Sequence, residues 1–524
     1  MNNKRFFGWG MLALVLLVFG MSLVRPLAWP DEARYGGVGY GMLVSGDWLA
    51  PRLDGMPFFH KPPLLHWLQA SSMAVFGVHV WSARLVPLAH AIVMLLSMYW
   101  ATRHFAGEQV AQRACWILGT SLTIMAGGQY LNHDMPVAAW IGLAIWCFGG
   151  ALLVQGKTGR RLALLGFVAC GLGVLGKGLI GLVLPGLVVF VWLFVVRLWP
   201  RALHLPWGMG LLLFALVALP WFVLAQRQYP ELFDYLIIGQ HFRRYTGSTF
   251  NNKVPFWFYL PILAGLLFPW ALLAAWDGLR SAWRQRLALL RQPEPWTALL
   301  WVWVIAITVF FSLPKSKLVG YILPVLPPLA VLAAQAWQTR WGQSLRAGRV
   351  FALLCAFNIG LALLLNHTGG QRSLDSGSRD VAQTLSTRIE PGQAVWSTGG
   401  FPYDLAWLAR LRQPLVVLDD WDKARREASD NWQRELFEGG DFDPEAAARW
   451  LQPIERLQQP PVGTWLVARP DMVGKSAVSA WRLVCVGRAW ALWQARDSGL
   501  ESPKTAEHKG LQCGQTHGHE QRPQ

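Results

Sequence analysis

The ionisable side chains whose types and spacing most clearly suggest chemistry lie in residues 29–65. Asp31 and Glu32 follow Pro30 directly, and Arg34 and Tyr35 come next along the chain. A carboxylate can take a proton from an attacking hydroxyl or stabilise developing positive charge, so Asp31 and Glu32 are candidate catalytic residues. The structural alternative is that they only begin a helix, because acidic side chains after a proline suit a helix N-terminus.

The same stretch closes with His60, Lys61 and two prolines. Proline restricts the residue before it to extended backbone, so Lys61 is held in a rigid approach. The run over residues 63–76 predicts a helix with proline in its first turn. An ammonium group beside the free amides of such a turn suits one phosphate group. The alternative is a lysine that reaches to lipid headgroups.

Further polar clusters stand at the ends of apolar runs. Asp134 is a third candidate catalytic carboxylate, although it could simply cap the run that follows it. The remaining candidates would bind a phosphate together with Lys61, Arg34 and Tyr35, and they are Lys177, Arg243, Arg244, Lys315, Lys317 and Tyr321. Each cluster alone could be surface charge at the membrane interface. A shared site requires that all the clusters lie on the same side of the membrane.

The composition identifies the setting. The 524 residues are 53% hydrophobic and only 15% charged, with 31 tryptophans, which is not the composition of a soluble globular protein. The formal net charge of +17 does not require nucleic acid as a partner, because most basic residues lie in short loops between apolar runs. The sequence therefore predicts a mainly α-helical, polytopic membrane protein surrounded by membrane lipids.

Apolar runs of roughly 15–22 residues predict about eleven transmembrane helices, and at most about thirteen. Lys4 and Arg5 before the first run place the N-terminus in the cytoplasm. The predicted spans are residues 7–24, 85–102, 114–128, 135–154, 162–176, 178–196, 208–225, 255–276, 296–313, 318–338 and 350–365. This count puts arginine-rich loops inside and all the polar clusters named above outside, so the clusters share one face.

The first outer loop also predicts a helix along the membrane surface, because Tyr35, Val38 and Met42 fall on one stripe. Beyond residue 365 the chain becomes polar, with β-like runs at 394–397, 414–418, 464–467 and 483–486. We therefore expect a transmembrane domain over 1–365, a soluble α/β domain over 366–496 on the outer side, and a disordered tail over 497–524. The cysteines are too few and too scattered for a disulfide framework.

The interiors of the predicted spans hold almost no ionisable residues, with His90 as the nearest exception. Ion-coupled carriers place such groups near the bilayer midplane, so a lipid or polysaccharide transporter is the less favoured function. No glycine motif for phosphates is present, which argues against a nucleotide cofactor.

Several motifs in order resemble the polyprenyl-phosphate-sugar-dependent glycosyltransferases. They are PDEARY, SGDWLAPRLDG, FFHKPPL, NHDMP, GKG, QHFRRY and LPKSKLVGYILP. The resemblance covers about residues 1–340. It is nearest to the bacterial lipid A 4-amino-4-deoxy-L-arabinose transferases, relatives of the protein O-mannosyltransferases.

The resemblance implies a GT-C fold in the bacterial inner membrane, with a periplasmic active site and a periplasmic C-terminal domain. It implies that an undecaprenyl phosphate-linked sugar is the donor and that lipid A or another glycolipid is the acceptor. Asp31 matches the family's essential acid and Lys61 its phosphate-binding lysine. A protein O-glycosyltransferase would use the same donor site and remains the closest alternative.

The resemblance also implies one divalent metal ion. His241 matches a histidine associated with that ion, and His60 stands where the family often has an acid. Imidazole and carboxylate ligands suit zinc or manganese, but two histidines also occur on a wet protein surface by chance. Metal binding through His60 and His241 is therefore one of two open interpretations.

The predicted topology can be tested by cysteine labelling from the outer side of the membrane. A single cysteine near residue 380 should react with an impermeant reagent. One near residue 288 should be protected, because its arginine-rich loop is expected on the cytoplasmic side. Labelling of both positions, or the reverse pattern, would contradict the shared face.

Overall fold

The computed structural model describes residues 3–236, 253–284, 294–342, 344–427, 431–471, 480–496 and 512–514. The chain forms two compact units. The membrane unit comprises Met1–Arg25, His60–Ser72 and Val80–His367, and the C-terminal unit comprises Pro26–Phe59, Met73–His79 and Thr368–Gln524. The first outer loop, which the sequence analysis assigned to the transmembrane domain, is thus grouped with the C-terminal residues.

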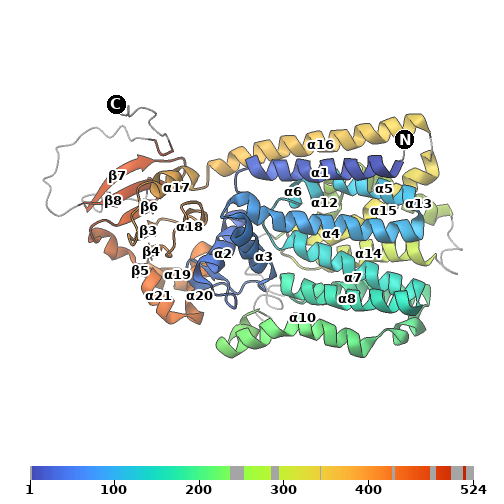
Figure 1. The fold of residues 1–524 in the computed structure, drawn as a ribbon, viewed down its shortest axis with the longest axis horizontal. Helices are drawn as coiled ribbons and strands as arrows, with labels where there is room; N and C mark the ends of the chain where they lie inside the picture. The colour runs from blue at the N-terminus through green and yellow to red at the C-terminus, as the bar shows by residue number, and fades with distance from the viewer. Residues whose placement is uncertain are drawn as a thin grey trace. The chain divides into compact units, whose positions relative to one another are not determined.

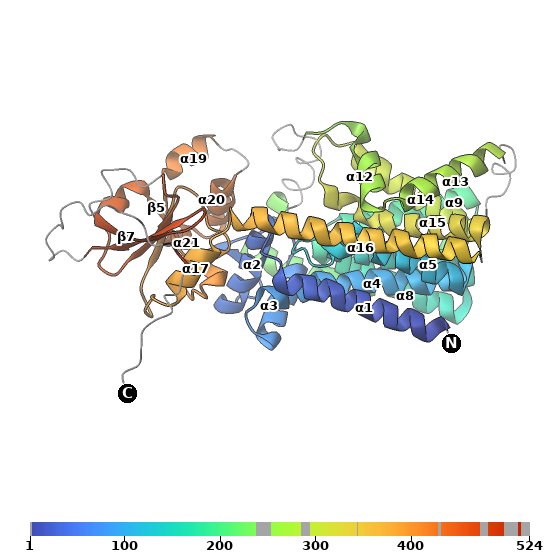
Figure 2. The ribbon, with the colours of Figure 1, turned by 90° about the horizontal axis from the view of Figure 1, so that it is seen from above.

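The membrane unit is a bundle of long helices that run side by side (Figures 1 and 2). Helix α7 packs against α4, α8 and α9 in its centre. The helices are α1 (Asn3–Val24), α3 (Leu64–Phe76), α4 (Val80–Ala106), α5 (Glu108–Gly119), α6 (Leu122–Gly127), α7 (Asp134–Val154), α8 (Gly156–Lys177), α9 (Ile180–Val196), η1 (Trp199–His204), α10 (Trp207–Gln228), η3 (Phe256–Phe258), α12 (Tyr259–Leu266), α13 (Trp270–Arg284), α14 (Pro295–Ser312), η4 (Val319–Val325), α15 (Leu326–Trp341) and α16 (Leu345–Leu374). The last residues of α3 and α16 belong to the C-terminal unit.

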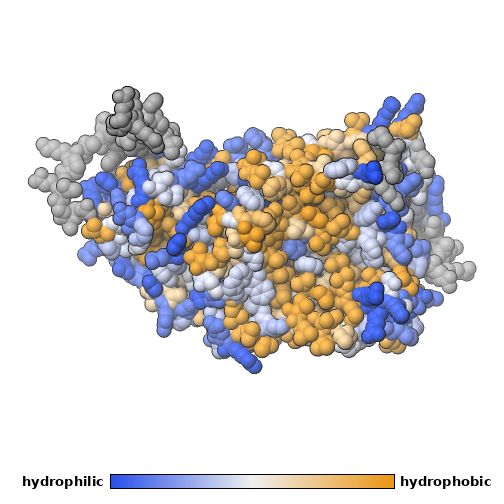
Figure 3. Space-filling model, in the orientation of Figure 1, coloured by the Kyte–Doolittle hydropathy of each residue, from blue (hydrophilic) through white to orange (hydrophobic). Residues whose placement is uncertain are grey.

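Within the described residues, eight helices are long and apolar enough to cross a membrane, or nine if one bent pair is a single span. The chain is therefore a multi-pass, mainly helical membrane protein, as the composition predicts. Many apolar side chains on these helices are exposed, among them Leu16, Phe190, Leu216 and Leu353. Figure 3 shows hydrophobic side chains gathered over the helices of this unit, where lipid chains would replace water.

Three predicted spans differ from single long helices. The run 114–128 is divided between α5 and α6, since Thr120 and Ser121 hydrogen-bond to backbone carbonyls of the preceding turn and the helix ends there. The run 255–276 bends by 115° between α12 and α13, where Pro269 lacks an amide hydrogen. The third, α9, has 17 residues and is shorter than a typical span.

The C-terminal unit contains a six-stranded sheet of order β5-β4-β3-β6-β8-β7. Strands β5, β4, β3 and β6 are parallel, and β8 joins β6 and β7 by antiparallel pairing. The strands are β3 (Val395–Thr398), β4 (Val416–Asp419), β5 (Leu451–Pro453), β6 (Trp465–Ala468), β7 (Trp481–Val486) and β8 (Ala491–Ala495). The helices are α17 (Arg379–Ser386), α18 (Leu405–Leu408), α19 (Trp421–Glu427), α20 (Trp432–Phe442), α21 (Pro444–Trp450) and η5 (Ile454–Gln458).

The first outer loop supplies α2 (Asp31–Ser45) and the hairpin β1 (Arg52–Leu53) and β2 (Met56–Pro57) to this unit. The predicted helix exists, but Val38 is fully buried in the hydrophobic core of the C-terminal unit and Tyr35 packs against that core. Trp407 of α18 lies so close to Gly36 that a Cβ there would be 2.2 Å from its ring. The apolar stripe of α2 therefore packs against protein, which corrects the expectation of a helix lying on lipid.

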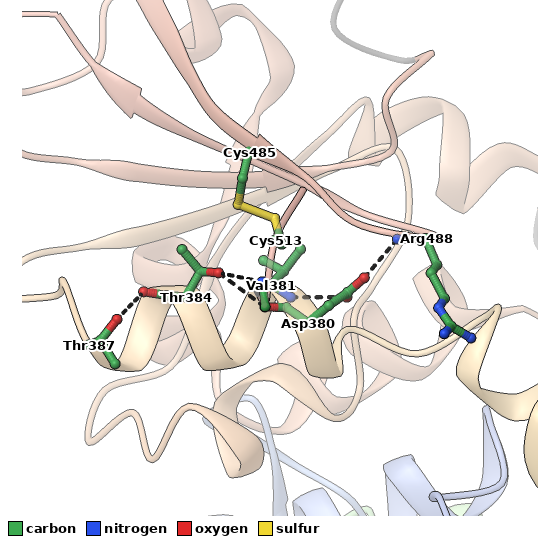
Figure 4. The surroundings of a disulfide bond; sticks show 8 residues. Asp380, Val381, Thr384, Thr387, Cys485, Arg488 and Cys513 are labelled. Carbon is green, nitrogen blue, oxygen red and sulfur yellow. Dashed lines mark hydrogen bonds between the residues drawn. A yellow bond between two sulfur atoms is a disulfide. The ribbon is translucent and has the colours of Figure 1, made fainter. Parts of the chain in front are cut away.

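One disulfide joins Cys485 on β7 to Cys513, although the cysteines are too few for a disulfide framework (Figure 4). Cys513 lies in the stretch that the sequence predicts to be disordered, and its amide donates to the carbonyl of Val486. Gly514 donates to the hydroxyl of Thr384 on α17. Residues 512–514 are thus fixed against the sheet. The other four cysteines are buried and form no disulfide.

Asp54 forms the turn of the β1–β2 hairpin together with Gly55, and both have positive φ angles of 50° and 83°. Such a turn matches the twist of a hairpin. One carboxylate oxygen of Asp54 accepts the amide hydrogen of Leu415 at 2.7 Å, and the other is buried without a hydrogen-bond partner in the described structure. Burial raises the pKa of Asp54 to about 7, against the opposing effect of the Leu415 amide.

This carboxyl should make stability depend on pH. Because the folded state binds the proton more tightly than the unfolded state, its contribution is fully present below pH of about 4 and is lost as the pH rises through 7. Asp54→Asn keeps the acceptor and removes the charge. Its stability advantage should therefore grow over this range to at most about 4 kcal/mol.

The measurement is thermal unfolding of purified wild type and Asp54→Asn between pH 4 and pH 8. Asp422→Asn, on the exposed side of α19, is the control and should change little. An Asp54→Asn difference that does not vary with pH would contradict the assignment.

Candidate functional site

Asp134 and Lys177 form an ion pair at the end of the membrane unit where α7 begins and α8 ends. Their side chains are only 12% and 9% exposed. Asn132 orients the carboxylate, because its amide nitrogen donates to Asp134 Oδ2 at 2.8 Å and its own oxygen accepts the Asp134 backbone amide. Two clusters that the sequence analysis placed on one face are therefore in direct contact.

Tyr321 and Gly320 of η4 complete this cluster. The ammonium of Lys177 lies 4.4 Å from the centre of the Tyr321 ring, which is a cation–π contact. A Cβ at Gly320 would lie 1.8 Å from Asp134 Oδ2, so no other residue fits there without movement. The segment that contains GYILP is thus packed directly on the carboxylate.

His133 lies in the same cluster and packs against His66 of α3. Its Nδ1 donates to the carbonyl oxygen of Gly176 at 2.8 Å, and its ring centre lies 5.2 Å from that of His66. Burial, together with the nearby His66, Lys61 and Lys177, lowers the pKa of His133 well below its ordinary value. His133 and Asp134 of the NHDMP motif therefore hold Gly176 and Lys177 of the GKG motif. The His133 imidazole is neutral although lysines lie near it.

Sequence reasoning missed His66 and gave His133 no role. His66 is fully buried on α3, and its only signal was a histidine in an otherwise apolar helical run.

The predicted lysines are held by backbone oxygens. Lys61 Nζ donates to the carbonyl of His60 at 2.7 Å. Lys317 is almost fully buried, and its Nζ donates to the carbonyl of Val254 at 3.1 Å. The Lys315 carbonyl accepts the Val254 amide, so this segment runs beside the residues before η3. Backbone carbonyl oxygens orient these ammonium groups through hydrogen bonds.

In the C-terminal unit, Asp31 belongs to a chain of ion pairs. Arg34 Nη2 lies 2.6 Å from Asp31 Oδ1, and its Nη1 pairs with Glu435 of α20. Glu435 also accepts the hydroxyl hydrogen of Tyr403 at 2.7 Å. Asp31 is 48% exposed, whereas Arg34 and Glu435 are largely buried. Arg34 thus fixes an accessible carboxylate at the first turn of α2.

The electrostatics of this network raise the pKa values of Arg34 and Tyr403. Burial alone would lower the pKa of Arg34, but Tyr35, Glu435, Tyr403 and Asp31 outweigh it and raise that pKa. Burial and the Glu435 carboxylate raise the pKa of Tyr403 well above its ordinary value. Tyr403 therefore remains a neutral hydrogen-bond donor.

Glu32 and Tyr35 occupy structural positions beside Asp31. Glu32 is fully buried and accepts the backbone amide of Ala28 at 2.7 Å, so it caps the turn that enters α2. The Tyr35 ring lies 4.9 Å from the Arg34 guanidinium.

The predicted metal ligands are only partly described. His60 lies with its ring centre 6.1 Å from that of Tyr235. His241, Arg243 and Arg244 lie outside the described residues. Among the described residues, no group of three or more His, Cys, Asp or Glu side chains is arranged to hold a metal ion. The metal through His60 and His241 stays a prediction.

Comparison with known proteins supports the resemblance. Residues 60–223, which contain Lys61, Asp134 and Lys177, match the family model for dolichyl-phosphate-mannose-protein mannosyltransferase. The undecaprenyl phosphate-alpha-4-amino-4-deoxy-L-arabinose arabinosyl transferase of Pseudomonas paraeruginosa is 34% identical over 361 residues, which are 67% of this chain and 64% of that protein. Transferase 2 of Sodalis glossinidius is 33% identical over 68% of this chain and 65% of its own length.

Solved structures extend the likeness to the whole fold. ArnT from Cupriavidus metallidurans, crystallised with undecaprenyl phosphate, has a TM-score of 0.76 at 23% identity and covers 95% of this chain and 99% of its own. The apo oligosaccharyltransferase of Archaeoglobus fulgidus has a TM-score of 0.56 at 14% identity, covering 90% of this chain and 70% of its own.

The chain is a relative of the polyprenyl-phosphate-sugar-dependent GT-C glycosyltransferases, and the resemblance predicted from its motifs is confirmed. The alignments span slightly less than two thirds of the length of the first arabinosyl transferases.

The Asp134–Lys177 pair should behave as a coupled unit. Removing one partner leaves an uncompensated buried charge, which costs roughly 3–5 kcal/mol. Asp134→Asn and Lys177→Met should therefore each destabilise the purified protein strongly, and the double variant should be more stable than either single variant. Thermal unfolding in one detergent measures all four proteins, with Lys157→Met on the exposed start of α8 as the control. Strictly additive losses would show that the two groups are not coupled.

Proposed function

We propose that this protein is an inner-membrane glycosyltransferase that moves a sugar from undecaprenyl phosphate to a lipid acceptor such as lipid A on the periplasmic side. The observation that carries the proposal is the 34% identity to the arabinosyl transferase of Pseudomonas paraeruginosa over 67% of this chain. The family-model match over residues 60–223, which contain Lys61, Asp134 and Lys177, adds to it. The sugar that fits those relatives is 4-amino-4-deoxy-L-arabinose, a pentose.

The cationic cluster would bind the donor phosphate. Breaking the bond between the sugar and the phosphate leaves the electron pair on the departing polyprenyl phosphate, and positive groups stabilise that charge. Lys61 and Lys317 carry ammonium groups that backbone carbonyl oxygens orient, and both are proposed contacts of this phosphate. The other proposed phosphate contacts are Lys177, Lys315, Tyr321, Arg243 and Arg244.

Asp31 is the proposed catalytic carboxylate because it matches the family's acid and is accessible. With a hydroxyl acceptor, Asp31 takes the proton as the acceptor oxygen bonds to the sugar. With an ionised phosphate acceptor no proton is removed, and Asp31 positions the sugar or its amine. Arg34 is assigned as a positioning residue for Asp31 rather than a phosphate ligand, since both its ion pairs are internal.

Glu32 and Asp134 would support the site indirectly. Glu32 shapes the entry to α2, and Asp134 sets the position of the Lys177 ammonium. A zinc or manganese ion held by His60 and His241 would supply a Lewis acid at the phosphate. Only His60 is described, so every step above is assigned to side chains of the protein.

The disulfide supports the proposed orientation. Disulfides persist in oxidising compartments such as the bacterial periplasm and are rare in the cytosol. Cys485–Cys513 therefore favours a periplasmic C-terminal unit, and with it a periplasmic first loop, because residues 26–59 belong to the same unit. The cytoplasmic N-terminus then follows from Lys4 and Arg5.

A protein O-glycosyltransferase is the second candidate, because the family model over residues 60–223 describes protein mannosyltransferases. It would share the donor site and differ only in the acceptor. A lipid or polysaccharide transporter is the third, and the near absence of charge within the described spans disfavours it.

The test is sugar transfer by the purified protein, with an undecaprenyl phosphate-linked aminoarabinose as donor and lipid A as acceptor, followed by mass spectrometry. Asp31→Asn should abolish turnover and leave donor binding intact. Lys61→Ala should weaken donor binding by about ten- to a hundredfold, because it removes a hydrogen bond to a charged group. Asp47→Asn, in the same loop, is the control for general damage.

Near-normal turnover by a folded Asp31→Asn protein would leave Asp31 as a helix-start residue. Transfer to a peptide but not to lipid A would favour the protein glycosyltransferase.

A further inference from the structure

A second polar site lies at the other end of α7 and α8. The last turn of α7, the first turn of α8 and η1 surround a pocket of about 650 Å³. Helix α7 has 21 residues, so this pocket is roughly 30 Å from the Asp134–Lys177 pair. The pocket therefore belongs to a different site from the one proposed for the donor phosphate.

The lining of this pocket is basic. Arg160 comes from α8, and Arg201 and His204 come from η1, with Gln155 at the turn between α7 and α8. None of the described lining residues is acidic. The segments 155–161 and 197–206 are far apart in sequence, and the fold brings Arg160 of the first and Arg201 of the second to one cavity.

The walls of the pocket are fixed by backbone contacts. Arg201 Nη1 donates to the carbonyl of Leu152 at 3.0 Å, which leaves other guanidinium donors for a ligand. His204 Nδ1 bonds to the carbonyl of Pro200 at 3.1 Å. A Cβ at Gly159 would lie 2.8 Å from the carbonyl of Ala151, so the turn is closely packed. These contacts hold Arg201 and the turn between α7 and α8 in place, and Arg160 and His204 are exposed beside them.

The surroundings of the pocket match the boundary between lipid headgroups and acyl chains. Trp199, Leu203 and Trp207 are exposed beside it, and Leu203 is 80% exposed. The indole nitrogen of Trp207 donates to the carbonyl of Ala202. Aromatic and apolar side chains next to arginines are typical of segments that lie at the membrane interface.

We propose that this pocket binds the phosphate-bearing headgroup of an anionic membrane phospholipid. Arginine pairs with phosphate through charge-assisted hydrogen bonds, and basic pockets at the membrane surface hold anionic lipids. Scattered interfacial arginines would satisfy the positive-inside rule without a cavity, and the cavity is what distinguishes this site. The inference does not depend on the proposed sugar transfer.

The test measures lipid retention by the full chain in nanodiscs of phosphatidylglycerol and phosphatidylcholine, using native mass spectrometry. Arg160→Gln should weaken phosphatidylglycerol retention by about fivefold, the effect typical of one arginine at an anionic surface. Arg161→Gln is the matched control, because Arg161 is the next residue on α8 and does not line the pocket. His204→Gln is a second variant that leaves the Arg201 contact to α7 unchanged.

The outcomes separate a built site from general charge and from free phosphate. Weaker retention of phosphatidylglycerol by the Arg160→Gln and His204→Gln variants, but not by Arg161→Gln, supports the proposal. Equal effects of Arg160→Gln and Arg161→Gln, or no effect of either, would overturn it. Displacement of retained lipid by inorganic phosphate at millimolar concentration would overturn the assignment to a lipid headgroup. Sugar transfer is not part of the readout, so failure here leaves the proposed function untouched.

Discussion

The ion pair between Asp134 and Lys177 joins three elements of the membrane unit, α7, α8 and η4. A charge buried beside apolar helices must be paired, because desolvation of an isolated carboxylate or ammonium is very unfavourable. The pair joins the start of α7 to the end of α8, and Asn132, Tyr321 and Gly320 pack around it. Once these residues are in contact, the ends of α7, α8 and η4 cannot move independently.

The same pair explains how the candidate phosphate site is organised. His133 holds the carbonyl of Gly176 while its neighbour Asp134 holds the ammonium of Lys177. Two consecutive residues thereby orient two consecutive residues of another helix. Lys317 is oriented differently, by the backbone carbonyl oxygens of Val254 and Pro314. The proposed phosphate contacts therefore include lysines with different partners, a carboxylate for Lys177 and backbone carbonyls for Lys317.

The first outer loop is held by contacts within the C-terminal unit. Its carboxylate at Asp31 is held by Arg34, which Glu435 and Tyr403 of the C-terminal unit hold in turn. The hairpin turn at Asp54 contacts the amide of Leu415 in the same unit. The C-terminal unit therefore supports the proposed catalytic acid. Substitutions at Glu435 or Tyr403 should alter the position of Asp31 through Arg34.

Sequence alone determined the class of the protein and singled out residues that the fold brings into contact. Long apolar runs must form helices in lipid, because the backbone can satisfy its hydrogen bonds there in no other way apart from a closed barrel. Motif order was sufficient to indicate the glycosyltransferase family, and the clusters at Asp134 and Lys177 were correctly expected to share one face. The four predicted strands also correspond to β3, β4, β6 and β7.

The tertiary structure decided what depends on partners distant in sequence. An apolar stripe on α2 buries equally well against lipid or protein, and only the fold shows that Val38 packs in the C-terminal core. The same holds for Arg34, whose pairing with Glu435 crosses some 400 residues of sequence. Cys513 likewise sits in a polar tail whose composition predicts disorder, yet Cys485 fixes it to the sheet. Local composition shows whether a residue prefers burial or a charged partner. Which residue satisfies that preference is decided only when the chain folds.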